Sequence, residues 1–189
     1  MTSSQNNIIL TIGESPRTVF SSKSMSLMLN TKRDMSLTKR LNYYVKKGFL
    51  LNPRKGIYTK RKFNPEELAG QVFVPSYLSL EYVLQRAGII FQYDSAITSV
   101  SYLSREIEMA GQTYRYRQIK DDILYNTEGI VNSDNINIAI PERAILDMMY
   151  LSPEFYFDNL AGVNKKLIAK LLPIYKSQRL NERVEKMFK

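Results

Sequence analysis

The sequence contains no cysteine and no histidine among its 189 residues. Without cysteine there are no disulfides and no thiolate chemistry, which fits a reducing cytoplasm. Without histidine the chain lacks both the commonest general base and the commonest metal ligand. We therefore expect a cytoplasmic protein with no metal site and no cofactor.

Long apolar runs are also missing. No run is long enough to span a bilayer, and residues 8–12 are too short and lack the basic flank of a secretory signal. Hydrophobic content of 44% and charged content of 24% are typical of globular proteins and differ from those of disordered chains. The expectation is a globular protein with no membrane partner.

Acidic residues are scarce in one part of the chain. Residues 1–65 carry 13 Lys/Arg and 2 Asp/Glu, a net charge of +11. Residues 66–163 have a net charge of −8, and residues 164–189 one of +6. A basic helix is often only a solvated face, but here the cations crowd together with almost no acids between them. This segregation indicates nucleic-acid binding in the first part and another role in the second.

The stretch 34–62, DMSLTKRLNYYVKKGFLLNPRKGIYTKRK, predicts a helix followed by a hairpin. Ser36 caps or starts the helix, and Gly48 ends it in a left-handed conformation. Apolar residues recur at i, i+4, i+7 and i+8, namely Leu37, Leu41, Tyr44 and Val45. The opposite side of the helix carries Lys39, Asn42, Tyr43 and Lys46, with Ser36 at its rim. The pattern is that of an amphipathic helix with a cationic outer face.

After this helix, residues 49–51 and 57–59 flank a turn at 52–56, in which Pro53 sets φ and Gly56 closes the turn. Earlier in the chain we expect a helix at 7–13, a β-segment at 18–20 and a helix that begins at Ser21 or Ser22. This order of elements is that of a winged helix-turn-helix. We therefore predict a DNA-binding domain of that class at residues 1–63.

For residues 64–189 we predict a second domain of the α+β class, which 64–75 links to the first. Asn64 and Pro65 signal a short helix in that linker. We then expect a helix from Ser76 or Ser79, strands between 96 and 140 with one at 123–125, and a buried helix that begins at Pro141. Two further helices are expected at 164–175 and 177–188. The predicted fold is α+β: an N-terminal winged helix-turn-helix, then a domain with a small, mostly antiparallel sheet and C-terminal helices.

No known catalytic motif occurs in the chain, so we predict no catalytic residue. Glu106 and Glu108 could pair with Asp121 or Asp122 in a two-metal site for nucleic-acid cleavage. A solvated sheet face explains these carboxylates more simply, since no lysine follows them at a short fixed spacing. The alternation of tyrosine and arginine at 114–117 fits base stacking or a plain hairpin. Arg143 and Asp147, four residues apart, suggest a structural helix pair.

Three segments resemble the AbiEi family of antitoxins. The run 36–58, with KKGFL and RKGIY, is similar to the winged-helix part of that family. PSYLSLEY at 75–82 with Gly88-Ile89, and IPERAILD at 140–147, resemble two segments of its second domain. The matches cover nearly the whole chain in the same order, but no family motif matches after Ser152.

The resemblance implies an antitoxin and transcriptional autorepressor of a type IV toxin–antitoxin, or abortive phage infection, system. Its partners would be double-stranded DNA, at an operator upstream of its own operon, and a nucleotidyltransferase-like toxin. No toxin-facing residue can be assigned.

In this hypothesis Asn42 reads adenine and Lys39 reads guanine, while surrounding cations hold phosphates. The complete predicted DNA-binding set is Lys32, Arg33, Ser36, Lys39, Asn42, Tyr43, Lys46, Lys47, Arg54, Lys55, Lys60 and Arg61. One alternative is a metal-dependent nuclease or nucleotidyl-transfer enzyme that uses the winged helix as a targeting module. Another is a protein–protein interaction module.

Overall fold

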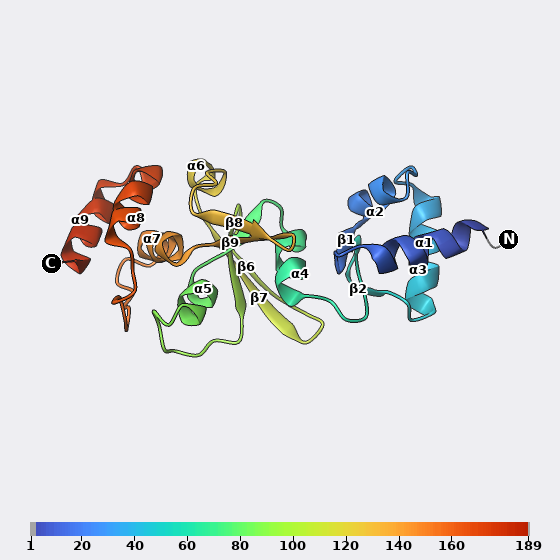
Figure 1. The fold of residues 1–189 in the computed structure, drawn as a ribbon, viewed down its shortest axis with the longest axis horizontal. Helices are drawn as coiled ribbons and strands as arrows, with labels where there is room; N and C mark the ends of the chain where they lie inside the picture. The colour runs from blue at the N-terminus through green and yellow to red at the C-terminus, as the bar shows by residue number, and fades with distance from the viewer. Residues whose placement is uncertain (1–2, 189) are drawn as a thin grey trace. The chain divides into compact units, whose positions relative to one another are not determined.

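The computed structural model describes residues 3–188, with side chains from residue 8 onward. The chain divides into two compact units, the first ending at Val72 and the second beginning at Phe73. Each unit is considered by itself below. Both contain helices and strands, so the fold is α+β (Figure 1).

The first unit contains four helices and a three-stranded antiparallel sheet within its described residues. The elements follow in the order α1 (Ser3–Glu14), β1 (Val19–Ser21), α2 (Ser22–Met28), α3 (Met35–Lys46), β2 (Leu51–Arg54), β3 (Ile57–Thr59) and α4 (Pro65–Val72). Strand β3 lies in the middle of the sheet, between β1 and β2, and a bulge shifts the register of β2 against β3. The sheet therefore joins the hairpin β2–β3 to the start of the chain.

The core of this unit is formed by apolar residues of α1, α2 and α3 together with Phe20 of β1 and Tyr58 of β3. Ile8 and Ile12 of α1, Met25 of α2, and Leu37 and Leu41 of α3 are all buried together. The spacing of the apolar residues in α3 is the one predicted from the sequence, and burying them orients the opposite face of α3 to solvent. The predicted helix start at Ser21 is also found, since the Ser21 side chain accepts from the N–H of Ser24.

Helix α4 belongs to the first unit, although we had expected residues 64–75 to be a linker after a domain ending at 63. The buried carboxylate of Glu67 accepts hydrogen bonds from the backbone N–H of Thr18 (2.8 Å) and from its hydroxyl (2.6 Å). The same hydroxyl accepts from the N–H of Asn64 (2.9 Å). These bonds fasten the start of α4 to the segment before β1, so the first unit continues to Val72.

The second unit contains a six-stranded sheet and five α-helices within the described residues. The strands are β4 (Ser76–Leu78), β5 (Ile97–Ser101), β6 (Arg105–Met109), β7 (Gln112–Gln118), β8 (Ile130–Ser133) and β9 (Ile136–Ala139). The helices are α5 (Glu81–Arg86), α6 (Asp121–Leu124), α7 (Pro141–Leu151), α8 (Lys165–Leu171) and α9 (Gln178–Met187), with a 3-10 turn, η1 (Leu172–Tyr175), between the last two.

The strand order in this sheet is β6-β7-β5-β4-β9-β8. Three neighbouring pairs are antiparallel, and two, β5 with β7 and β4 with β9, are parallel. The sheet is thus mixed, and larger than the small, mostly antiparallel sheet we had predicted. Every residue of β4 and β5, the central strands, is buried.

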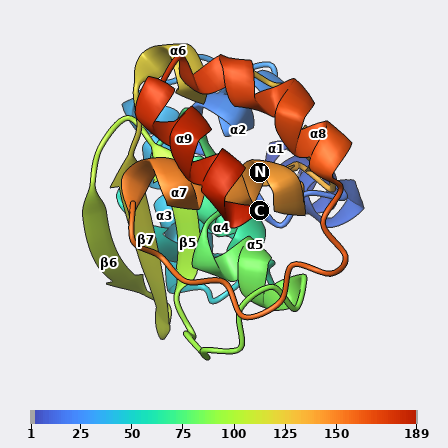
Figure 2. The same ribbon diagram turned by 90° about the vertical axis from the view of Figure 1, so that its left-hand side faces the viewer.

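Helices pack on the sheet and on one another. Helix α7, buried at every position from Glu142 to Met149, contacts α5 and β9, and α8 and α9 pack against it in turn. Figure 2 shows α8 and α9 beside α7. Pro141 begins α7 as predicted. None of the helices in the described part of the chain is long and apolar enough to cross a membrane.

Two predicted elements of the second unit were wrong, and one strand was missed. Residues 76–78 form β4 rather than the start of a helix, and the helix begins only at Glu81. Residues 123–125, predicted as a strand, lie at the end of the short helix α6. Strand β8 was not predicted at all. Pairing of β4 with β5 and β9, and contact of α6 with η1, decide the structure of the first two segments, whereas β8 forms a local hairpin with β9.

Candidate nucleic-acid interface

Both ends of α3 are fixed by local hydrogen bonds. At the N-terminus the carboxylate of Asp34, rather than Ser36, is the cap, accepting from the N–H of Leu37 at 2.9 Å. At the C-terminus Gly48 has φ +73°, and the N–H groups of Gly48 and Phe49 donate to the carbonyl oxygens of Val45 and Tyr44. This is a Schellman motif, which ends the helix where the sequence predicted.

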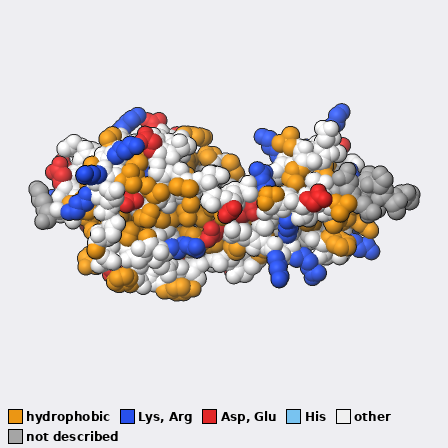
Figure 3. Space-filling view, in the orientation of Figure 1, with side chains coloured by type: hydrophobic (Ala, Val, Ile, Leu, Met, Phe, Trp, Pro, Cys, Tyr) orange, Lys and Arg blue, Asp and Glu red, His pale blue; other side chains and the backbone are white. Residues whose placement is uncertain are grey.

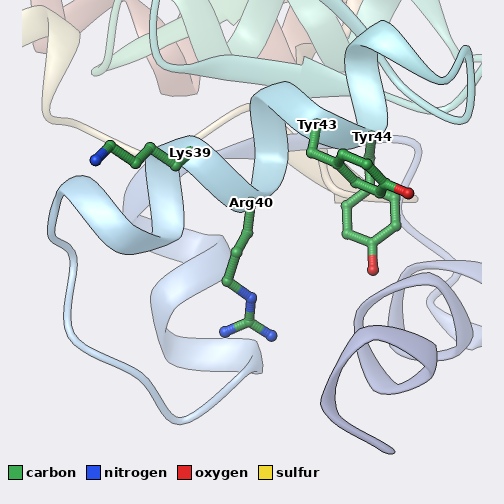
Figure 4. A pocket seen from close by; sticks show the side chains of 4 residues that line it. All are labelled: Lys39, Arg40, Tyr43 and Tyr44. Carbon is green, nitrogen blue, oxygen red and sulfur yellow. The ribbon is translucent and has the colours of Figure 1, made fainter. Parts of the chain in front are cut away.

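The face of α3 turned away from the core is exposed. Its exposed residues include six of the predicted site residues, Ser36, Lys39, Asn42, Tyr43, Lys46 and Lys47. The ammonium of Lys47 lies 5.8 Å from the centre of the Tyr43 ring, a cation–π contact along the edge of the helix. Lys39, Arg40, Tyr43 and Tyr44 line a pocket on α3 (Figure 4). The helix therefore presents cations, an amide and an aromatic ring on one side.

The hairpin β2–β3 is tied into a fixed position. The side-chain amide of Asn52 donates to the carbonyl oxygens of Arg54 (2.8 Å) and Ile57 (2.6 Å). The N–H and hydroxyl of Ser22, the first residue of α2, both donate to the carbonyl oxygen of Gly56. The turn is shorter than predicted, since β2 runs to Arg54. Lys55 is left exposed at its tip.

A hollow of about 700 Å³ separates the N-terminal half of α3 from this hairpin. Arg33 and Asn42 line it from one side and Lys55 from the other, so the structure brings these predicted site residues together. The Tyr58 hydroxyl, also in the lining, lies 3.5 Å from the Asn42 side-chain oxygen. Burial raises the pKa of Tyr58, so its hydroxyl keeps its proton at neutral pH.

The remaining predicted cations differ in how accessible they are. Lys32 and Arg61 are exposed, and Arg54 is half-buried. Lys60 is directed elsewhere, because its ammonium donates to the carbonyl oxygen of Ser15 at 2.7 Å. We therefore leave Lys60 out of the interface. On the face seen in Figure 3, blue Lys and Arg side chains outnumber red acidic ones over the unit that ends at Val72.

The sequence prediction missed Met35, Thr38 and Arg40. Met35 and Thr38 line the hollow beside the hairpin, and Arg40 lines the pocket on the other edge of α3. Helical spacing could have found Met35, which precedes Lys39 by four residues and Asn42 by seven. These three residues widen the candidate interface to both edges of the helix.

The carboxylates proposed for a two-metal site are paired with basic side chains at two of their positions. Glu106 lies opposite Arg115 on the neighbouring strand and accepts from it at 2.8 Å. Asp122, at the start of α6, accepts from Lys176 at 2.9 Å. Among the residues that the structure describes, no group of three acidic side chains is placed to hold a metal ion. Tyr114 and Tyr116 are buried, so their rings cannot stack on bases.

Arg143 and Asp147 form a fully buried pair, with Nε 3.4 Å from Oδ1. The carboxylate also accepts from the hydroxyls of Ser79 (2.7 Å), Tyr175 (2.6 Å) and Tyr77 (3.2 Å). Burial raises the pKa of Asp147, although Arg143 and these hydroxyls oppose the rise. The network links β4, α7 and η1 through fully buried side chains, which suits a structural role.

Comparison with known proteins gives the fold alone. No protein-family model matches this sequence, and no curated protein does. Among solved structures, the RV2827C protein from Mycobacterium tuberculosis is similar, with a TM-score of 0.54 and 12% identity. The match covers 96% of this chain and 74% of that one. The arrangement of helices and strands along almost the whole chain is therefore shared with a known structure.

Proposed function

We propose that this protein is a sequence-specific DNA-binding repressor whose first unit is a winged helix. Helix α3 would be the recognition helix and the hairpin β2–β3 the wing. The observation that carries the proposal is the exposed face of α3, with Lys39, Asn42 and Lys46 outward, next to a hairpin tip with Lys55. A helix with such a face fits the major groove, where amides and cations pair with base edges.

Each side chain has a role that follows from its chemistry. Asn42 suits adenine, because an amide donates to N7 and accepts from N6. Lys39 suits guanine, which presents two acceptors in the major groove. Lys46, Lys47 and Lys55 would hold phosphates on either side, with Lys32, Arg33, Arg54 and Arg61 as further positive charges near the backbone.

If this protein functions like the AbiEi antitoxins that it resembles, its operator lies upstream of its own operon. The same resemblance makes the second unit the part that counters a nucleotidyltransferase-like toxin in a type IV system. Support comes from the three matching segments, which fall on α3 with the wing, on β4 with α5, and on α7. In this proposal the chain itself is not an enzyme, and it acts in the cytoplasm where DNA and toxin are present.

Two readouts in one strain test this function. The upstream region drives a reporter, and the adjacent open reading frame is induced with and without this protein. The proposal predicts reporter repression and rescue of growth. A variant with Lys39→Ala and Asn42→Ala should lose repression and keep rescue, because both residues are exposed in the first unit. If the native protein does not repress the reporter, the repressor role is contradicted. If cells that produce the native protein still stop growing when the adjacent open reading frame is induced, the antitoxin role is contradicted.

A further inference from the structure

Met35 is a large apolar side chain that the core does not use. It is the first residue of α3 and is 75% exposed. Exposure alone does not single it out, since Leu10 and Leu27 are exposed in the same unit, and scattered surface apolar residues are normal. What distinguishes Met35 is its position.

Met35 lies on the outer face of α3. Met35, Lys39, Asn42 and Lys46 are spaced at i, i+4, i+7 and i+11, which puts them in one row along the helix. Met35 also lines the hollow that contains Asn42 and Lys55. It occupies the N-terminal turn, the part of a recognition helix that contacts base edges.

The chemistry of the row identifies what Met35 would meet. Of the four bases, thymine alone presents a methyl group in the major groove, and apolar side chains pack against it. Lys39 and Asn42 match guanine and adenine through the polar groups at their ends, whereas Met35 has no charged or amide group. The thioether side chain of methionine is flexible and polarizable, so it can reach and pack against a small apolar group at a range of distances from the helix.

We infer that Met35 is a specificity-determining residue that packs against the 5-methyl group of a thymine in the operator. This rests on the proposed function, because it needs α3 in the major groove. The contact would favour thymine over uracil and cytosine at one position of the operator. It would add nothing to the phosphate contacts, so it is separable from the electrostatic part of binding.

The probe is the upstream DNA fragment amplified either with thymidine triphosphate or with deoxyuridine triphosphate. Uracil differs from thymine only by the missing methyl, so hydrogen-bond donors, acceptors and phosphates stay the same. The native protein should bind the thymine fragment more tightly, by about fourfold for each methyl removed from contact. Met35→Ala should bind both fragments with equal affinity, close to that of the native protein for the uracil fragment.

Two control variants make the result specific. Met35→Leu keeps an apolar side chain and should keep most of the discrimination, whereas Leu10→Ala removes an exposed apolar residue of α1 and should leave it unchanged. Circular dichroism confirms that each variant is folded.

Each outcome decides one question. A native protein that binds the two fragments equally, or a Met35→Ala variant that discriminates as the native protein does, overturns the inference while DNA binding stands. If the native protein binds neither fragment at low salt, the proposed function fails and the inference fails with it.

Discussion

At the scale of single residues, Arg143 shows how a charged side chain becomes part of the core. Its guanidinium donates to the carbonyl oxygens of Glu128 (2.9 Å) and Ile123 (2.8 Å), besides facing Asp147. The i, i+4 spacing of Arg143 and Asp147 predicted a pair but gave no sign that both would be fully buried. Their burial depends on partners far away in the sequence, such as Tyr77 and Tyr175.

Arg143→Ala should destabilise the second unit by about 3–5 kcal/mol, because it leaves the Asp147 carboxylate buried without its counter-ion. The free energy of unfolding, measured by urea denaturation, gives the effect. Arg179→Ala removes an exposed arginine of α9 and should change stability by no more than about 0.5 kcal/mol. A loss below about 1 kcal/mol at Arg143 would show that the network is not stabilising in the way proposed.

Asp94 should make a small contribution to stability that is lost in acid. Burial raises the pKa of its carboxyl, but the N–H of Ala96 and the paired Arg115 outweigh this, so the pKa lies below its ordinary value. A lowered pKa in the folded state gives stability that is complete above the unfolded pKa of about 3.9 and declines as pH falls through the folded value.

Asp94→Asn should therefore reduce stability at pH 7 by at most about 1 kcal/mol, given that the pair is about one-third exposed. The difference between native and variant should vanish below the folded pKa. Urea denaturation of both proteins at several pH values between about 2 and 7 measures this difference in the free energy of unfolding. A difference that grows as pH falls would have the wrong sign for this ion pair.

At the scale of elements, α3 could be predicted because its determinants are local. The spacing of Leu37, Leu41 and Tyr44 and the helix stop at Gly48 are all within the segment. The cap was predicted two residues too late in the chain, since the side chain of Asp34 rather than that of Ser36 accepts the N–H of Leu37. The candidate site on α3 could be predicted for the same reason, apart from Met35, Thr38 and Arg40.

Segments whose structure depends on distant partners could not be predicted. Residues 76–78 form a strand because β5 and β9 pair with them on either side. Central strand β5 is buried on both faces. The alternation of polar and apolar residues in its sequence is typical of a half-buried strand, so it does not reveal this burial. Similarly, nothing in the sequence indicates that Lys60 reaches back to Ser15, because that contact spans 45 positions.

Asp34→Ala should lower the stability of the first unit by about 1 kcal/mol, since it removes the cap of α3. Asp34→Ser restores an acceptor at the same position and should recover most of the loss. Urea denaturation of the three proteins provides the comparison. Equal stability of the alanine and serine variants would mean that the capping bond at Leu37 contributes little.

At the scale of the whole molecule, charge and fold divide at nearly the same place. The basic residues 1–65 fall within the first unit, and most of the acidic residues fall in the second. The first unit, residues 1–72, carries 13 Lys/Arg and 4 Asp/Glu, a net charge of +9, and is therefore attracted to any polyanion. The affinity at one salt concentration cannot separate a specific DNA interface from this general attraction. The salt dependence of the binding constant, measured for single-residue variants, can separate the two.

The most direct test is therefore a titration of the protein with its own upstream DNA over a series of salt concentrations. The logarithm of the binding constant should fall linearly with the logarithm of the salt concentration, and Lys55→Ala should make the slope shallower by about 0.9. Lys186→Ala, an exposed lysine of α9, is the matched control and should leave the slope unchanged. No binding at about 50 mM salt, or the same slope for native protein and Lys55→Ala, would contradict a DNA interface formed by α3 and the hairpin.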